Sequence, residues 1–397
     1  MIKKKLHITL FDGSFKTTPF INRLAKGLAT HGHTISIIGF NEHNPHPIPN
    51  VIYQSLGSNR AHVRLFVTSL GLALGSKSLR AVKNTFLYLA KKNRKKLQQQ
   101  NLNLGLKKLN PDIVHLQWPS LLPWMEPYMP YPHFKVILSQ RGFHNNVRPF
   151  VDEANFKYLQ KWYPKIAGFH SVSHAMATTG DKIWSAPEKL NRVVYTGLDL
   201  NRLSFSASYS QKPPLRLLSI GRAHWIKGYD YALRACKLLR EKNIPFQYTI
   251  IGGADDEELQ FLVHDLGLGK TVVLEQRLPQ QEVFQRMAAA SVLLMPSLEE
   301  GIPNVVVEAM ALGLPVISTN CGGVPELIGH GVEGWLVPTR NPQALAGAIE
   351  DFLGLSPNRV EEVRLAARKK VEQQHNEEQM VKGMEDLYYK VLSLNAR

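Results

Sequence analysis

The sequence has few cysteines and no long hydrophobic run. Only Cys236 and Cys321 occur among its 397 residues, which excludes a disulfide framework or a zinc site built on cysteines. The longest apolar stretch, residues 65–74, is far shorter than the roughly 20 residues of a membrane-spanning helix. Hydrophobic residues make up 44% of the chain and charged residues 20%, as in globular proteins. We therefore expect a folded protein of a reducing, cytoplasmic compartment.

Acidic residues are missing from one long segment. Residues 43–111 contain twelve Lys and Arg residues but no Asp or Glu. Residues 1–200 hold 27 bases and 9 acids, a net charge of +18, whereas residues 201–397 hold 21 and 23, a net charge of −2. The net charge of +16 therefore arises in the first half. Such asymmetry indicates a nucleic acid or an anionic membrane as partner.

Residues 77–97 within this segment have the apolar period of a helix, with bases grouped on a neighbouring face. One interpretation is a helix that packs on a sheet and keeps a solvated basic face. We favour a second, in which residues 60–108 meet anionic headgroups and the apolar, flexible segment 62–74 enters the interface. The expected membrane-facing residues are Arg80, Lys83, Lys91, Lys92, Arg94, Lys95 and Lys96. No nucleic-acid-binding module is recognisable, so we expect no nucleic acid partner.

Strand-like apolar runs alternate with helix-like segments in both halves. The expected strands lie at residues 6–11, 34–39, 51–55, 112–118, 135–139, 169–173, 215–220, 247–251, 272–274, 291–295 and 315–318. This alternation is typical of doubly wound parallel sheets in an α/β fold. A polar segment at 200–214 ends in Pro-Pro and reads as a linker. We therefore predict Rossmann-like domains at residues 1–199 and 200–375, with a last helix, about 376–397, that packs back on the first domain.

A basic loop bounded by glycines follows the expected strand 215–220, and it reads Gly221-Arg222-Ala-His-Trp-Ile-Lys227-Gly228. Arginine offers a planar fork and lysine a point charge, so the pair suits an anion. A solvated basic loop would have the same composition. Ligands of open parallel sheets bind at the carboxyl ends of strands, so both domains are expected to face a cleft with these ends.

A second motif runs from Glu299 to Met310. Gly301 lets a backbone approach a ligand, and Pro303 and Asn304 open a helix whose N-terminus attracts phosphate. Asn304 and Glu308 share one face of that helix. A carboxylate such as that of Glu300 or Glu308 can accept hydrogen bonds from vicinal hydroxyls of a sugar or ribose. The alternative is an exposed acidic loop before a capped helix.

The motifs together resemble a known family. In order, GR…KG, EEGIPNVVVEAMALGLPVIST, CGGVPELI and GVEGWLVP are similar to the retaining glycosyltransferases of family 4, the group 1 glycosyltransferases, which have the GT-B fold. The spacing of Glu300 and Glu308 matches their motif of two glutamates separated by seven residues. The resemblance covers essentially the whole chain, is strong over residues 215–340 and is looser before residue 200.

The resemblance implies a retaining hexosyltransferase that uses a nucleotide-diphosphate sugar as donor. Arg222 and Lys227 would bind the diphosphate and stabilise the leaving group, and Glu300 would hold hydroxyls of the donor sugar; these are the predicted catalytic residues. Glu308 would hold the ribose. The other donor-binding residues implied are Gly13, Gly221, Gly301, Ile302, Asn304 and Val305. The nucleobase of the donor would lie near Arg277 and Leu278. No metal and no cofactor are expected, because the family is usually metal-independent. No protein nucleophile is expected either, because the departing phosphate is commonly assigned as the general base that accepts the acceptor's proton.

The first half departs from the family pattern at one turn. Many members carry a Thr-x-His-Gly type turn after a strand, where this chain reads Ser139-Gln140-Arg141-Gly142. Either Arg141 binds donor or acceptor oxygens, or His144 replaces the usual histidine; we favour Arg141. His115 and His174 are expected to be structural.

The expected acceptor is lipid-linked, or a polysaccharide or glycolipid precursor, at the cytoplasmic face of the cell membrane. Two alternatives stay open from the sequence. One is a soluble acceptor, as in sucrose- or trehalose-type synthases. The other is a polyanion-binding protein without catalysis.

Overall fold

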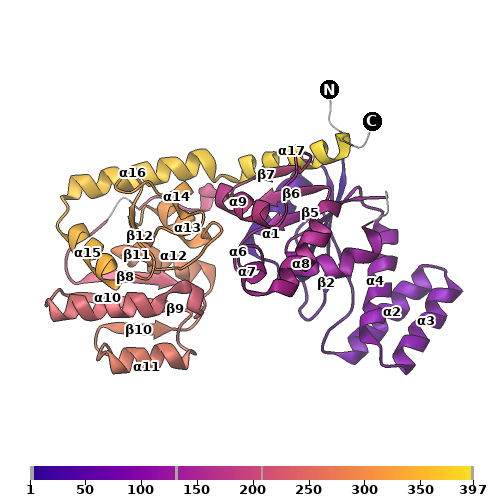
Figure 1. The fold of residues 1–397 in the computed structure, drawn as a ribbon, viewed down its shortest axis with the longest axis horizontal. Coiled ribbons are helices and arrows are strands. Elements are labelled where there is room, and N and C mark those ends of the chain that lie inside the picture. The colour runs from indigo at the N-terminus through magenta and orange to yellow at the C-terminus, as the bar shows by residue number, and fades with distance from the viewer. Residues whose placement is uncertain (1–3, 130–132, 207–208, 395–397) are drawn as a thin grey trace. The chain divides into compact units, whose positions relative to one another are not determined.

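The computed structural model describes residues 4–129, 133–206 and 209–394. It contains two compact units, each with a parallel sheet (Figure 1). The first unit comprises Met1–Val172, Ala177–Gly197 and Glu377–Arg397, and the second comprises Ser173–Met176 and Leu198–Asn376. We expected residues 173–176 in the first domain, whereas they group with the second.

The first unit has seven parallel strands in the order β3-β2-β1-β4-β5-β6-β7. Their bounds are His7–Ser14 (β1), Thr34–Phe40 (β2), Val51–Ser55 (β3), Ile113–Leu116 (β4), Lys135–Gln140 (β5), Gly168–Ser171 (β6) and Asn191–Val193 (β7). The central strands are apolar and buried on both faces, as a doubly wound sheet requires. β1 runs through Ser14, beyond the predicted strand 6–11, so Asp12 and Gly13 belong to its end.

Helices cover both faces of this first sheet. α1 (Pro19–Thr30) and α17 (Glu377–Ser393) pack over one face, where they share an apolar cluster with β1 and β2. α4 (Arg94–Leu109) and α8 (Glu153–Trp162) share a second cluster on the other face. A Cβ on Gly27 of α1 would lie 2.3 Å from Cγ2 of Val381, so the two helices approach closely. The C-terminal helix therefore lies in the first unit.

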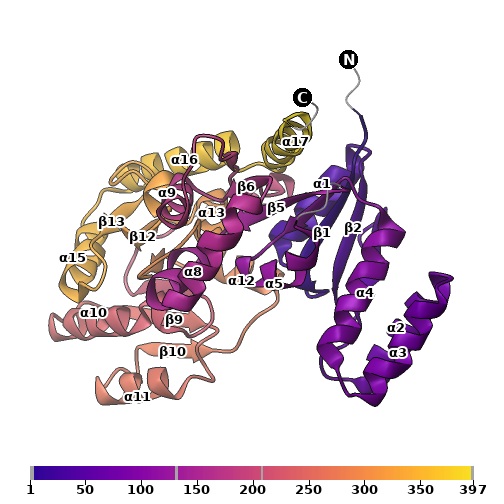
Figure 2. The same cartoon turned by 45° about the vertical axis from the view of Figure 1, so that its right-hand side comes forward.

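A pair of helices stands outside α4 (Figure 2). α2 (His62–Gly75) and α3 (Leu79–Ala90) pack on each other and on α4. Asn101 of α4 donates to Ser69 Oγ at 2.8 Å and to the Leu56 carbonyl at 3.0 Å, which fixes α2. The remaining helices of this unit are α5 (Leu122–Met125), α6 (Phe143–Asn146), α7 (Arg148–Val151) and α9 (His174–Ile183).

The single helix predicted over residues 77–97 is wrong. The chain turns between α3 and α4 at Lys92, which has a φ of +50°, and the Asn93 side chain caps α4 by accepting from the Lys96 amide. Part of the apolar face that could have packed on the sheet is instead exposed, with Leu79 89% and Phe86 53% accessible, whereas Leu97 is buried. Residues 62–74, expected to be flexible, form α2.

The second unit has six parallel strands in the order β10-β9-β8-β11-β12-β13. Their bounds are Leu215–Ile220 (β8), Phe246–Ile251 (β9), Val272–Glu275 (β10), Val292–Met295 (β11), Val316–Thr319 (β12) and Trp335–Val337 (β13). The helices are α10 (Tyr229–Glu241), α11 (Glu257–Asp265), α12 (Gln280–Ala289), α13 (Asn304–Leu312), α14 (Val324–Leu327), α15 (Pro342–Leu353) and α16 (Pro357–Gln374). α10 and α15 cover one face and α12 and α13 the other. The sequence predicts no strand or helix in residues 335–374, whereas the structure has β13, α15 and α16 there.

Candidate donor site

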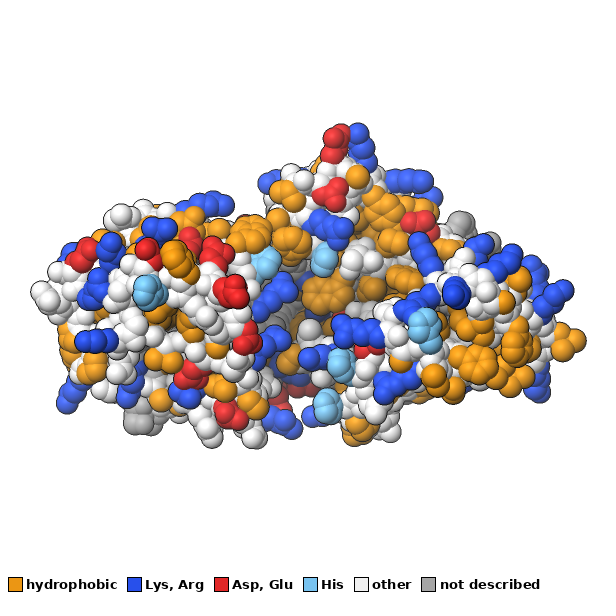
Figure 3. All heavy atoms as spheres, turned by 90° about the horizontal axis from the view of Figure 1, so that it is seen from below, with side chains coloured by type: hydrophobic (Ala, Val, Ile, Leu, Met, Phe, Trp, Pro, Cys, Tyr) orange, Lys and Arg blue, Asp and Glu red, His pale blue; other side chains and the backbone are white. Residues whose placement is uncertain are grey.

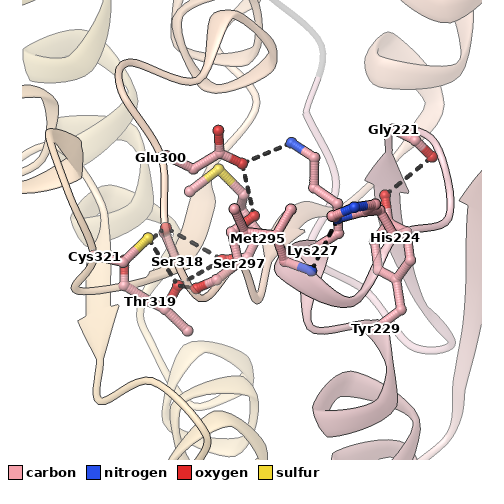
Figure 4. A network of polar contacts seen from close by, with 11 residues as sticks. Gly221, His224, Lys227, Tyr229, Met295, Ser297, Glu300, Ser318, Thr319 and Cys321 are labelled. Atoms are coloured by element: carbon pink, nitrogen blue, oxygen red, sulfur yellow. Dashed lines mark hydrogen bonds and ion pairs between the residues drawn. The ribbon is translucent and has the colours of Figure 1, made fainter. Parts of the chain in front are cut away.

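Three loops meet beyond the carboxyl ends of β8, β11 and β12 in the second unit (Figure 4). They are residues 221–228, 296–303 and 320–323. β11 lies between β8 and β12 in the parallel sheet, so their carboxyl ends share one edge. The topology therefore brings the three sequence motifs together.

Lys227 and Glu300 form an ion pair between two of these loops. Lys227 Nζ donates to Glu300 Oε1 at 2.6 Å, and Ser297 Oγ donates to the same oxygen at 2.8 Å. The two charged side chains are only 23% and 15% exposed, so water screens them weakly. Glu300 Oε2 accepts no hydrogen bond from the described residues, which leaves one carboxylate oxygen for a ligand hydroxyl.

Gly228 lets the lysine loop approach the glutamate loop. Its φ is +62°, and a Cβ on it would lie 2.1 Å from the Pro296 carbonyl oxygen. The Leu298 amide donates to the Ile226 carbonyl at 2.7 Å, which joins the two loops. A glycine after Lys227 is therefore needed for both the backbone conformation and the close approach.

The glycine turn at residues 320–323 supports the glutamate loop from the other side. A Cβ would lie 1.8 Å from the Glu300 carbonyl oxygen at Gly322 and 2.0 Å from the Gly301 carbonyl oxygen at Gly323. The Gly323 amide donates to the Glu300 carbonyl at 3.2 Å. Burial and the carboxylates of the glutamate loop raise the pKa of the neighbouring Cys321 to about 12. This thiol therefore stays protonated and is no nucleophile at neutral pH.

Helix α13 begins directly after the glutamate loop, with Asn304 exposed at its first position. The first amides of a helix have no intrahelical acceptor, and the helix dipole favours an anion there. Glu308, one turn on, is half-buried and accepts from Gln280 Nε2 at 3.1 Å. Ile302 and Val305 pack on the apolar cluster beneath. This end of the site combines a helix N-terminus, whose dipole favours an anion, with a carboxylate.

Arg222 and Arg277, which is expected near the nucleobase, are more exposed to solvent than Lys227 and Glu300. Arg222 is exposed and forms no ion pair with any described residue. The Gly221 carbonyl before it accepts from the Tyr229 hydroxyl at 3.2 Å. Arg277 is exposed in the loop after β10, whereas Leu278 packs on the core.

Sequence reasoning missed two polar residues in these loops. Ser297 directly follows β11 and holds Glu300, so its place at a strand end was a usable signal. His224 Nδ1 accepts from the Ile226 amide at 3.3 Å, which shapes the turn before Lys227. Burial, followed by the cations of Arg222 and Lys227, lowers the pKa of His224. A low pKa keeps this imidazole neutral and able to accept.

In the first unit, Arg141 directly follows β5. Its Nη2 donates to Gln117 Oε1 at 2.8 Å, and its guanidinium lies 3.8 Å from the centre of the Phe20 ring. Its Nε is buried and has no hydrogen-bond partner among the described residues. Burial lowers the pKa of Arg141 to about 9, although the neighbouring Asp12 opposes this shift. Arg141 is thus a cation fixed by Gln117 and Phe20, and its Nε–H has no acceptor within the described ranges.

Asp12 and Gly13 end β1 in the same unit. Asp12 accepts from the Trp118 indole nitrogen at 2.7 Å, and burial raises the pKa of this carboxyl to about 6. Gly13 has a φ of +88°, and a Cβ on it would lie 3.1 Å from a methyl group of Leu121. The strand end therefore places a carboxyl group beside a glycine with a left-handed conformation.

The histidines of the first half differ in their surroundings. The half-buried His144 ring packs edge-on against Trp118, with 6.5 Å between ring centres. His115 is wholly buried, and its ring nitrogens bond to the Tyr388 hydroxyl at 2.9 Å and to Ser139 Oγ at 2.8 Å. Burial holds the pKa of His115 well below its usual value, so His115 serves the core. His174 is exposed at the start of α9, and it groups with the second unit although the rest of the helix, from Ala177, belongs to the first.

The basic residues expected at a membrane lie on α3, on α4 and in the turn between them. Arg80, Lys83, Lys91, Lys92, Lys95 and Lys96 are exposed, whereas Arg94 is half-buried and lies 3.1 Å from the His62 ring. Apolar side chains are exposed beside them on α2 and α3, namely Val63, Val67, Leu74, Leu79, Phe86 and Leu87. Figure 3 shows hydrophobic side chains gathered at this end of the first unit, on the right, with Lys and Arg around them.

Two kinds of site are not found within the described ranges. No group of three or more His, Cys, Asp or Glu side chains there could hold a metal ion. No helix in those ranges is both long and apolar enough to cross a bilayer. Metal independence stays a prediction.

The fold and the three-loop site define a class, the GT-B glycosyltransferases. A family model described as Glycosyltransferase Family 4 matches residues 19–202, and one described as Glycosyl transferases group 1 matches residues 203–370. The two models together span almost all of the chain. The protein therefore belongs to the family 4, group 1 glycosyltransferases.

Similar proteins are found in polysaccharide synthesis. The amylovoran biosynthesis glycosyltransferase AmsK of Erwinia amylovora is 40% identical over 197 residues, 48% of either chain. The putative colanic acid biosynthesis glycosyltransferase WcaL of Salmonella typhimurium is 35% identical over 199 residues, 48% of this chain and 49% of that protein. Each match spans about half the length of the relative.

Solved structures share the fold at low identity. Sucrose-phosphate synthase from Thermosynechococcus elongatus superposes with a TM-score of 0.77 and 18% identity, over 98% of this chain and all of that one. Anabaena HepE, solved in complex with UDP and glucose, superposes with a TM-score of 0.72 and 17% identity, over 97% of this chain and all of that one. These likenesses concern the fold alone.

The raised pKa of Asp12 is open to direct measurement. We expect the indole N–H signal of Trp118 to shift in NMR spectra with a midpoint near pH 6, because ionised Asp12 is the stronger acceptor. The folded state holds this proton more tightly than the unfolded chain, so the free energy of unfolding falls as pH rises from about 4 to about 6. Asp12→Asn should abolish the titration. A midpoint near pH 4 would contradict the burial of this carboxyl.

Proposed function

We propose that this protein transfers a sugar from a nucleotide-diphosphate sugar to an acceptor, with retention and without a metal ion or cofactor. The observation that carries the proposal is the shielded Lys227–Glu300 pair, 2.6 Å apart, with Arg222 on the same loop as Lys227 and the N-terminus of α13 after Glu300. Cations and helix amides suit a diphosphate, and a carboxylate suits sugar hydroxyls. The UDP and glucose bound to HepE are consistent with this class of donor.

The proposed reaction breaks the bond between the anomeric carbon and the diphosphate oxygen. The acceptor oxygen bonds to the same face of that carbon, and its proton passes to the departing phosphate. Negative charge grows on the diphosphate as it leaves, and Arg222 and Lys227 stabilise it. The ammonium group has three donors, so Lys227 can keep Glu300 while it donates to phosphate. Preorganised charges at a site with little water stabilise the transition state without reorganisation.

The acceptor side of the proposal is a lipid-linked sugar or a polysaccharide or glycolipid precursor at the cytoplasmic face of the membrane. AmsK and WcaL, which are named for amylovoran and colanic acid biosynthesis, support it. The exposed bases and apolar residues of α2 and α3 support membrane contact, because basic amphipathic helices bind anionic bilayers. Arg141, whose Nε has no partner in the described part of the chain, is proposed to bind donor or acceptor oxygens.

The catalytic proposal is tested by removing the ion pair. After a thermal-shift screen for the donor, we expect Lys227→Ala and Glu300→Gln each to lower kcat/KM about 100-fold or more, as the loss of one preorganised group does. The assay contains EDTA, and wild-type activity should persist in it. Lys242→Ala is the matched control, because Lys242 pairs with Glu350 at 2.7 Å on the surface of the same unit. Full activity in both site variants would refute the proposal.

The membrane proposal is tested by vesicle flotation. Removing two exposed charges in Lys83→Gln/Lys91→Gln should weaken binding to anionic vesicles about 30-fold, at about 1 kcal/mol for each base. The control Lys270→Gln/Lys369→Gln removes the same charge from exposed sites in the second unit. Equal binding to neutral and anionic vesicles, or an equal loss in the control, would argue against membrane contact through α3.

A further inference from the structure

A second cavity lies in the first unit, away from the strand ends described above. It has a volume of about 910 Å³ and lies between α3, α4 and the segments that precede β4 and β5. Asn110 and Pro111 lead into β4, and Phe134 directly precedes β5. The cavity is therefore at the amino ends of strands whose carboxyl ends carry Gln117 and Arg141. A strand of the length of β5 spans roughly 20 Å, so the cavity, here called the α3–α4 groove, is separate from Arg141.

The groove carries positive charge without compensation. Arg80 of α3 and Lys96 and Lys107 of α4 line it, and no acidic residue is among the described residues of its lining. None of these three cations forms an ion pair with a described residue. The surrounding segment 43–111 contains no Asp or Glu, and the carboxylates next to lining residues in the sequence, Asp112 and Glu126, pair with Lys4 and with the Tyr158 hydroxyl instead. Such a groove attracts an anionic ligand.

Amide side chains in the groove have unused hydrogen-bonding capacity. Asn84 and Asn103 are half-buried. Their side-chain amides form no hydrogen bond with any described residue. Gln99 is held in place, because its Nε2 donates to the Trp124 carbonyl at 3.1 Å and to the Tyr128 hydroxyl at 3.3 Å. Half-buried amides without partners favour a ligand that offers many hydroxyl groups.

Aromatic rings complete the lining. Tyr88 lies on α3, and Tyr128 and Phe134 lie on the opposite wall, with 6.2 Å between the last two ring centres. These half-buried rings provide rigid apolar surface next to the polar groups, on which the C–H face of a sugar ring can pack. A phospholipid headgroup would use the cations but leave the amides and rings without contacts. The combination of cations, amides and rings therefore favours a carbohydrate.

We propose that the α3–α4 groove binds an oligosaccharide that carries anionic groups, either carboxylates or phosphates. The groove is a second carbohydrate site, apart from the donor loops, and its volume lies within the usual range of ligand pockets. It would hold a growing or finished glycan chain on the first unit. This proposal concerns binding alone and does not rest on the proposed transferase activity.

The test is calorimetric titration of the full chain with defined sugars. The anionic probes are a hexamer of galacturonate and a phosphorylated mannose pentamer, and maltohexaose is the neutral probe. We expect at least one anionic probe to bind at least tenfold more tightly than maltohexaose. Lys107→Gln and Asn103→Asp should each weaken that binding at least tenfold, because the first removes a cation and the second adds a repelling charge.

Neighbouring residues provide the control. Lys107 and Lys108 are both exposed at the end of α4, but only Lys107 lines the groove, so Lys108→Gln should bind like the wild type. Glu300→Gln should also keep glycan binding, which separates this site from the donor site. An equal loss in Lys108→Gln would overturn the proposal. The proposal would also be overturned if neither anionic probe bound. A third contrary result would be that Lys107→Gln weakens binding to anionic vesicles and leaves sugar binding unchanged.

Discussion

The ion pair between Lys227 and Glu300 is the interaction on which the candidate donor site depends. It joins two loops that follow different strands, and it persists at 2.6 Å with little exposure to water. The backbone makes this possible, because Gly228, Gly322 and Gly323 stand where any Cβ would strike a neighbouring carbonyl oxygen. These three glycines thus have one physical purpose, which is to let three loops approach each other around a charged pair.

The two halves of the chain use charge in different ways. The second unit has almost no net charge and places single cations, such as Lys227, beside single carboxylates. The first unit has a large positive excess, to which residues 79–109, from the start of α3 to the end of α4, contribute nine bases and no acid. Part of that excess surrounds exposed apolar residues, and part lines a groove with amides and rings. We therefore propose two roles for these basic residues, which are binding to an anionic membrane and binding to an anionic oligosaccharide.

Much of the fold could be predicted from the sequence, because buried parallel strands are short apolar runs. β3 and β8 match their predicted bounds, residues 51–55 and 215–220. The helix break at Lys92 was missed because an apolar period continues across it, and α16 was missed because it is largely polar. Lys227, Glu300 and Gly323 could be found as motifs. The contact of Arg141 with Phe20 and the α3–α4 groove could not, since both join residues far apart in the chain.

The most direct test of the central claim is a crystal structure of the protein with its nucleotide-sugar donor, or with the nucleoside diphosphate and sugar together. We predict the diphosphate within hydrogen-bond distance of Lys227 and Arg222, and sugar hydroxyls on the free carboxylate oxygen of Glu300. The ribose should lie near Glu308. A diphosphate bound elsewhere, with the Lys227–Glu300 pair untouched, would contradict the proposed role of this site.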